Sequence, residues 1–307
     1  MEIDRRGFII AAGASALVAP AFGTEVETIK AVDTVPHIYD TKRPIGNLYA
    51  PNPDGVTAQQ LKQQAPNGVV GTIVIEASPW LEDNLWLLDA VNDEPFVVGV
   101  VGNLPLGDKI FPEYVERYSK HPLFLGIRHG NLWPGHDLPE QMKSPAFVAH
   151  LRLLAQADLT LDLANPRLNL LEAAVRVNDA VPELTVIVDH LGGYRPTMDE
   201  WVGLEPILRE YAERPNLYCK LTGLSSENPD ASPAQVVAEN RDRLDRFYDA
   251  FGRERTIGGG YFTTESLLIL NEYLVAESIE DRANFFWKNS VRAYKWTPRN
   301  SAQSSLG

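Results

Sequence analysis

The chain has 307 residues, a formal net charge of -13 and a single cysteine, Cys219. This length accommodates one (β/α)8 barrel without a second domain. An acidic surface repels phosphate backbones, which excludes nucleic acid as an expected partner. A single cysteine excludes an internal disulfide, and its setting in NLYCKLTG predicts a small buried core residue.

Residues 1–29 are predicted to be an export signal and leader that precede the fold. Arg5 and Arg6 stand before Gly7-Phe8-Ile9 and the small-residue apolar run IAAGASALVAPAFG, in the manner of a twin-arginine signal. We therefore expect a periplasmic or otherwise exported protein, with the twin-arginine export machinery as a partner and cleavage near Ala21. The run is too short for a permanent transmembrane span, and an uncleaved membrane anchor is the alternative.

From about residue 30, short apolar runs alternate with helical periods. Runs typical of strands occupy residues 31–39, 69–77, 95–102, 123–130, 159–164, 184–192, 217–223 and 255–260. Helical patterns between them occupy residues 57–65, 81–91, 111–120, 144–157, 168–181, 198–213 and 232–251, several of which begin with a Thr, Ser or Asp cap.

This alternation predicts parallel strands, because each return of the chain needs a helical crossover. Eight such units close a barrel and leave no edge strand. Residues 30–307 are therefore predicted to form a single α/β domain, a (β/α)8 TIM barrel. A doubly wound open sheet is the alternative; a Gly-rich phosphate loop after the first strand would favour it, and the sequence has none.

Polar residues gather at the predicted strand ends, the face on which barrel enzymes place their chemistry. In chain order these ends read DTVPH (33–37), IVIEA (73–77), GIRH (126–129), LD (161–162), DHLG (189–192), KLTG (220–223) and GGGYF (258–262). Together with EASPWLEDNLWLLDAV, PFVVGVVGNL and FFWKNSVRAYKW, the series resembles the amidohydrolase-related family, in its lactonase-like branch, over about residues 30–296. The resemblance implies an amidohydrolase-like barrel that hydrolyses a lactone or related ester of a sugar acid or small carboxylate.

The metal site implied by this resemblance is degenerate here. Family members usually end the first strand in H-x-H and the last in G-S-D-W, whose aspartate is both metal ligand and general base. Val35 and Gly260 stand at the first histidine and at the aspartate. The two imidazoles that remain, His37 and His190, seldom suffice for zinc. We therefore expect no cofactor and little metal; a divalent ion, zinc or manganese, held by His37, His190 and Glu76 is the alternative.

Lactone hydrolysis requires a base for the attacking water and a cation or N–H donors for the oxyanion. The predicted catalytic residues are His37, His190 and Lys220, and the predicted substrate-binding residues for a small-molecule substrate are Arg128, His129, Glu76 and Tyr261.

Several of these residues also have a structural interpretation. Arg128 could grip a carboxylate bidentately or pair with Glu76 or Asp162, and Lys220 could instead form a buried ion pair. Asp189 precedes His190, so strand alternation predicts that it points to the opposite face. Because the strand-eight aspartate is lost, a non-catalytic periplasmic barrel that binds a small sugar acid or a partner is the competing hypothesis.

Overall fold

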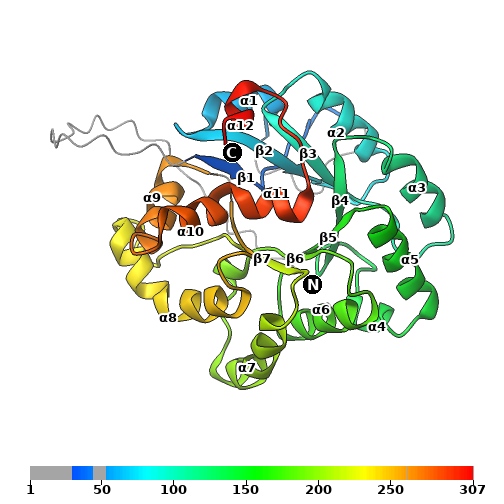
Figure 1. Cartoon of the computed structure of the whole chain (residues 1–307). Helices are drawn as coiled ribbons and strands as arrows, with labels where there is room; N and C mark the ends of the chain where they lie inside the picture. Colours follow the sequence, from blue (N-terminus) through cyan, green and yellow to red (C-terminus); the bar gives the residue numbers. More distant parts are fainter. Residues whose placement is uncertain (1–29, 44–52, 261, 307) are drawn as a thin grey trace.

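The structure is a computed structural model that describes residues 30–43, 53–260 and 262–306. Eight parallel strands lie in one sheet in the order β1 to β8 (Figure 1). The strands are β1 (Ala31–Asp33), β2 (Val69–Ile75), β3 (Val97–Gly102), β4 (Phe124–Gly130), β5 (Thr160–Ala164), β6 (Val186–Val188), β7 (Leu217–Leu221) and β8 (Thr256–Gly258). Every predicted strand region contains one of them, and the TIM-barrel prediction is confirmed. The predicted leader, residues 1–29, lies outside the described residues.

The ring of strands is nearly closed between β8 and β1. The Thr34 hydroxyl donates to the carbonyl of Gly258 at 3.4 Å. The Asp33 carboxylate accepts from the backbone N–H groups of Gly260, at 3.1 Å, and Phe262, at 2.6 Å. The carboxylate thereby gives hydrogen-bond partners to backbone N–H groups that would otherwise be buried without one. Asp33 therefore connects the segment after the last strand to the first strand.

Helices surround the ring, and all seven predicted helical regions contain one. Capping boxes at Thr57, Thr197 and Ser232 fix the starts of three of them. The helices are α1 (Ala58–Gln64), α2 (Asp83–Asn92), α3 (Phe111–Tyr118), α4 (Leu138–Gln141), α5 (Pro145–Gln156), α6 (Leu168–Ala180), α7 (Met198–Ala212), α8 (Pro233–Phe251), α9 (Thr264–Tyr273), α10 (Ile279–Ala283), α11 (Asn289–Tyr294) and α12 (Ser301–Ser304), with a 3-10 turn η1 (Leu191–Gly193) and a π-helix η2 (Asn284–Lys288).

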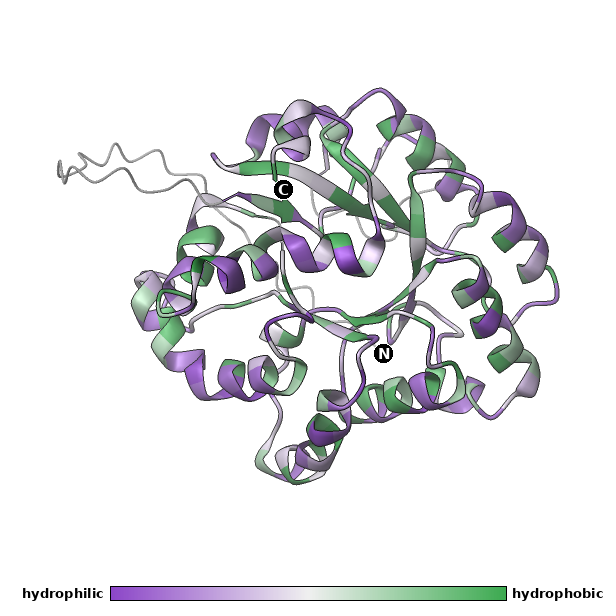
Figure 2. Cartoon of the chain, viewed as in Figure 1, coloured by the Kyte–Doolittle hydropathy of each residue, from purple (hydrophilic) through white to green (hydrophobic). Residues whose placement is uncertain are grey.

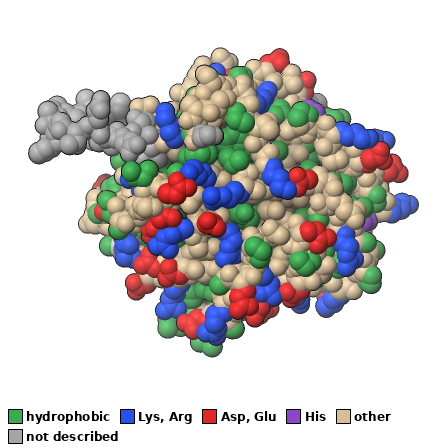
Figure 3. Space-filling view, in the orientation of Figure 1, with side chains coloured by type: hydrophobic (Ala, Val, Ile, Leu, Met, Phe, Trp, Pro, Cys, Tyr) green, Lys and Arg blue, Asp and Glu red, His purple; other side chains and the backbone are tan. Residues whose placement is uncertain are grey.

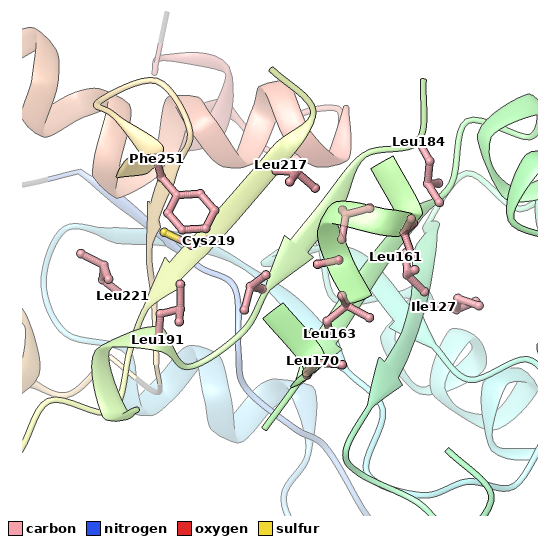
Figure 4. Packing of buried hydrophobic residues seen from close by; sticks show 14 of the residues in the cluster. Ile127, Leu161, Leu163, Leu170, Leu184, Leu191, Leu217, Cys219, Leu221 and Phe251 are labelled. Carbon is pink, nitrogen blue, oxygen red and sulfur yellow. The ribbon is translucent and has the colours of Figure 1, made fainter. Parts of the chain in front are cut away.

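Two apolar clusters form the core. The larger packs the outer faces of the strands against the helices, whose apolar sides face inward (Figures 2 and 4). Cys219 lies in it beside Phe251 (Figure 4), fully buried, which confirms its predicted core position. The smaller cluster fills the barrel and comprises Val32, Ile73, Ile75, Val98, Val101, Leu125, Ile187, Tyr218, Ile257, Ala293, Tyr294 and Trp296.

The C-terminal segment closes one end of the barrel. α11 runs across the ring of strands in Figure 1, and Tyr294 and Trp296 from this segment join the interior cluster. Arg299 donates to the carbonyls of Val91, Glu94 and Val97, which anchors the segment to the α2–β3 connection. The carboxyl ends of the strands form the opposite face of the barrel, where barrel enzymes place their active sites.

The outer surface carries charges of both signs, interspersed over the face shown in Figure 3. Within the described ranges, no helix is long and apolar enough to cross a membrane.

Candidate active site

His37 lies just after β1, where its backbone forms a bridge with Ile75 of β2. Its Nδ1 is 3.0 Å from the carbonyl oxygen of Ile75. A carbonyl can only accept, so Nδ1 carries the proton and Nε2 the lone pair. Burial, with the nearby positive charge of Arg128, lowers the pKa of His37 to about 3. The imidazole is therefore neutral at neutral pH.

His190 reaches the same end of the barrel through an unusual backbone conformation. Its φ of 62° places it in the left-handed region, which is uncommon for a residue other than glycine. Nδ1 lies 2.7 Å from the hydroxyl of Thr222, which follows β7. Burial lowers the pKa of His190 to about 4, although the charge of Asp189 opposes this shift. A second neutral imidazole thus lies within electrostatic reach of His37.

Asp189 lies inside the barrel, and the prediction that it points away is wrong. Ile187 belongs to the interior cluster, so strand alternation carries Asp189 to the interior as well. Its carboxylate lies 2.9 Å from Lys220 Nζ and 3.6 Å from Arg128 Nε. Burial acts to raise the pKa of Asp189, but the charges of Lys220 and Arg128 outweigh it and hold that pKa below its ordinary value.

Lys220 is fully buried at the centre of an ionic cluster. Its ammonium lies 2.8 Å from Asp162 Oδ2, 2.9 Å from Asp189 Oδ1 and 2.9 Å from the carbonyl oxygen of Thr34. Burial acts against its charge, yet the two carboxylates raise the pKa of Lys220. The ammonium donates hydrogen bonds to Thr34 and Asp162, while Asp189 pairs with it as an ion without forming a hydrogen bond, so the geometry corresponds to the buried-pair interpretation. An oxyanion would have to displace one of these partners.

Asp162 extends this cluster towards the closed end of the barrel. It lies on β5, and its Oδ2 also accepts the hydroxyl of Tyr294 at 2.5 Å. Burial raises the pKa of Asp162, while Lys220 acts in the opposite direction. Tyr294, Asp162, Lys220, Asp189 and Arg128 therefore form a chain of alternating polar contacts from the closed end to the active face.

The charge of Arg128 acts on both of the predicted catalytic histidines. The residue is buried on β4, and its ion pair is with Asp189, not with Glu76 or Asp162 as the sequence suggested. Its Nε has no hydrogen-bond partner among the described residues. Its positive charge contributes to the lowered pKa of both His37 and His190 and opposes the raised pKa of Glu76. Arg128 therefore faces the groups that the resemblance placed at the site.

His129 does not join Arg128, contrary to the shared substrate-binding role predicted for them. Ile127 packs in the outer cluster, and His129, two residues further along the strand, points to the same outer side. His129 Nε2 lies 2.7 Å from Gln141 Oε1, and its ring centroid is 3.9 Å from that of His136. Its side chain thus lies between the barrel wall and the β4–α5 connection. Tyr261, the other predicted substrate-binding residue, lies outside the described residues.

Glu76 follows β2 and is only 2% exposed. Its Oε1 accepts from Nε1 of Trp133 at 3.1 Å, and no partner for Oε2 occurs within the described ranges. Burial raises the pKa of Glu76 from its ordinary 4.5 to about 7, although Arg128 opposes the shift. Trp133 lies in the irregular loop after GIRH, where nothing in the sequence pattern indicated a contact with Glu76.

A family model described as amidohydrolase matches residues 42–296, well over half of the chain. The chain belongs to the amidohydrolase family. A curated relative, L-fucono-1,5-lactonase of Burkholderia ambifaria, is 30% identical over 198 residues, which cover 64% of this chain and 65% of that lactonase. The match thus spans slightly less than two thirds of the lactonase.

Solved structures share the fold. An amidohydrolase from Burkholderia multivorans with bound zinc superposes with a TM-score of 0.71 at 18% identity, covering 87% of this chain and 100% of that one. A putative 2-pyrone-4,6-dicarboxylic acid hydrolase from Pseudomonas putida superposes with a TM-score of 0.65 at 17% identity, covering 87% and 98%. The solved structures confirm the barrel, and the family model with the lactonase relative confirms the predicted amidohydrolase-related, lactonase-like assignment.

The donor set at the mouth does not fit the divalent ion that some of these amidohydrolases hold. In the described part of the chain, no three His, Cys, Asp or Glu side chains gather as metal ligands. Gly260, at the aspartate position, has a φ of 122°, where side chains are strained, and a Cβ there would lie 3.0 Å from Cβ of Thr222. The backbone conformation at residue 260 thus disfavours any side chain that could carry the carboxylate. The positive charge of Arg128 also disfavours a bound cation.

Proposed function

We propose that the chain hydrolyses a lactone, or a related ester, of a sugar acid or small carboxylate, with little or no bound metal. The similarity to L-fucono-1,5-lactonase supports the reaction class. The observation that carries the proposal is Arg128, a buried guanidinium that lies among the polar groups at the strand ends and whose Nε lacks a hydrogen-bond partner in the described residues. A fixed cation in a site sheltered from water stabilises the oxyanion of a tetrahedral intermediate.

The other polar groups have supporting roles in this proposal. His37 and His190 are neutral, so each can accept or donate a hydrogen bond and orient the attacking water or a substrate hydroxyl. Lys220 acts as a positioning residue, because it holds the Asp189 carboxylate that in turn faces Arg128. The combination supplies orientation and electrostatic stabilisation, the two requirements of ester hydrolysis that need no metal.

A screen of L-fucono-1,5-lactone, other sugar lactones and aryl esters tests this proposal. We expect turnover of at least one sugar lactone, measured by the acid that hydrolysis releases. Binding of the corresponding sugar acids without turnover of any ester would instead support the non-catalytic barrel, which the loss of the carboxylate at Gly260 favours. Calorimetry with those acids distinguishes the two outcomes.

We also propose that the chain is exported through its N-terminal arginine pair. Arg5 and Arg6 precede the small-residue apolar run, and β1 begins at residue 31, after that segment. Replacing both arginines with lysine is expected to retain the protein in the cytoplasm, with the fold unchanged because the leader precedes the first strand. Cell fractionation measures this, with Lys30→Arg as a matched control. Normal export of the double variant would contradict the twin-arginine interpretation.

A further inference from the structure

The loop that follows β4, residues 131–137, is fixed on the rim of the barrel. Its first residue, Asn131, donates from its side-chain amide to the carbonyl of Asn165 at 3.1 Å, and the Asn165 amide donates to the carbonyl of Asn131 at 2.9 Å. Towards the other end, the Gln141 side chain of α4 donates to the carbonyl of Gly135 at 3.1 Å. Hydrogen bonds to neighbouring elements therefore hold the loop at both ends.

A tight turn in this loop sets the position of Trp133. The carbonyl of Trp133 accepts from the backbone N–H of His136 at 3.0 Å. Pro134 and Gly135 occupy the two central positions, and the φ of Gly135 is 86°, as a type II turn requires. The turn ends at His136, whose ring centroid lies 3.9 Å from that of His129 on β4. Backbone geometry and packing against the barrel wall thus fix the residue from which the indole extends.

The indole of Trp133 crosses the carboxyl end of the barrel. Its Nε1 donates to Oε1 of Glu76 at 3.1 Å. Glu76 follows β2 and Trp133 follows β4, and β3 lies between these two strands in the ring. A side chain that connects the ends of β2 and β4 must lie over the carboxyl end of β3, on the face where barrel enzymes bind their substrates. Arg128 lies on β4, the strand from which this loop continues.

Core packing does not account for this tryptophan. Trp133 is only partly buried, and it belongs to neither of the two apolar clusters. Within the part of the chain that the structure describes, no aromatic ring or cation stacks on the indole. A large aromatic surface left partly open beside polar groups is typical of a ligand site. Because the indole N–H is already bonded to Glu76, a face of the ring is what remains for a ligand to contact.

We propose that Trp133 determines substrate specificity by stacking on the ring of a cyclic sugar lactone. The apolar C–H face of that ring packs on the indole, with the lactone carbonyl towards Arg128. The inference rests on the proposed lactone hydrolysis and narrows it to closed rings. An open chain presents no flat face to the indole, and it loses more conformational entropy when it is held in one shape.

Replacing Trp133 with alanine tests the stacking by kinetics. On the sugar lactone that the wild type hydrolyses best, KM is expected to rise about tenfold, with kcat little changed, because stacking holds the ground state and the transition state alike. The cyclic sugar that corresponds to this lactone should show a similar rise in its Ki. The open-chain acid that the reaction releases should keep its Ki within about twofold, because it has no ring to stack.

A second variant separates the ring from its hydrogen bond. Trp133→Phe keeps an aromatic face but loses the N–H that donates to Glu76, so its KM should stay within about threefold of wild type. The matched control is Trp201→Phe on α7, where the indole stacks on Phe247 with ring centroids 5.7 Å apart, and its KM should equal that of wild type. A Trp133→Phe protein with the same rise in KM as Trp133→Ala would overturn the stacking role.

A readout without turnover accompanies the kinetics. The indole N–H signal of Trp133 in nitrogen-15-labelled protein can be assigned by its loss in Trp133→Phe. Cyclic sugars that match the lactones of the screen are then added, beginning with L-fucose, which has the ring of L-fucono-1,5-lactone without its carbonyl. At least one of them is expected to shift the Trp133 signal and leave the Trp201 signal in place. No shift with any of these sugars would overturn the inference.

The two proposals fail in different ways. A wild-type protein that hydrolyses none of the esters contradicts the proposed function, while a shifted Trp133 signal in the same protein still supports a stacking site for sugar rings. Wild-type turnover of a sugar lactone with a Trp133→Ala KM within about twofold of wild type overturns the role of Trp133 alone.

Discussion

Replacing Lys220 with methionine is expected to lower the free energy of unfolding by about 3–5 kcal/mol, the usual cost of removing one partner from a buried ion pair. The variant would leave Asp162 and Asp189 facing each other in a fully buried setting without the ammonium that lies 2.8 and 2.9 Å from them. Chemical denaturation at pH 8 measures the loss. The loss should be smaller at pH 5, because the uncompensated carboxyls of the variant then hold protons.

Lys143→Met provides the matched control, since Lys143 pairs with Glu140 on the surface and is 70% exposed. Its removal should change stability by less than about 1 kcal/mol. If Lys220→Met fails to fold, adding Asp162→Asn should recover folded protein, because one buried charge is then removed. A Lys220→Met protein as stable as wild type would contradict the account of the ionic cluster.

Replacing Arg128 with glutamine is expected to reduce kcat by about 10²–10³-fold, the range found when one group that stabilises an oxyanion is removed. The guanidinium is the buried cation whose charge reaches His37, His190 and Glu76, so its loss removes the charge that would face the developing oxyanion. Arg128→Lys should retain part of the rate, because the charge remains but the planar fork is lost. Steady-state kinetics on the best lactone measure both variants.

Arg209→Gln, an exposed change on α7, serves as the control and should leave kcat unchanged. Thermal unfolding of each variant separates loss of catalysis from loss of fold, because Arg128 also neutralises part of the buried Asp189 charge. A folded Arg128→Gln protein with wild-type kcat would show that the guanidinium does not stabilise the intermediate.

The barrel could be predicted from the sequence because its signal is repeated and local. Eight apolar runs alternate with amphipathic periods, and each observed strand lies inside a predicted run. The strand order also predicted which residues lie at the mouth of the barrel, because the carboxyl ends of parallel strands meet at one end of it. Arg128 accordingly lies within electrostatic reach of His37, His190 and Glu76.

Details that depend on side-chain direction were harder to predict. Neighbouring side chains on a strand point to opposite sides of the barrel wall, so His129 does not share the position of Arg128, and Asp189 lies on the interior side beside Lys220, opposite to the prediction. The left-handed φ of His190 turns that side chain towards the mouth in a way that strand alternation does not predict. Trp133 was missed because its contact with Glu76 joins residues 57 positions apart through an irregular loop.

The central claim is that this amidohydrolase hydrolyses a lactone with side chains at the mouth of the barrel in place of a metal ion. One assay tests this claim most directly. Protein treated with a chelator and checked by elemental analysis is compared with untreated protein on the best lactone. We expect equal kcat/KM, and zinc and manganese well below one equivalent per chain before treatment. Loss of activity on stripping, recovery on adding zinc or manganese, and one equivalent of metal that disappears in His37→Ala would contradict the claim.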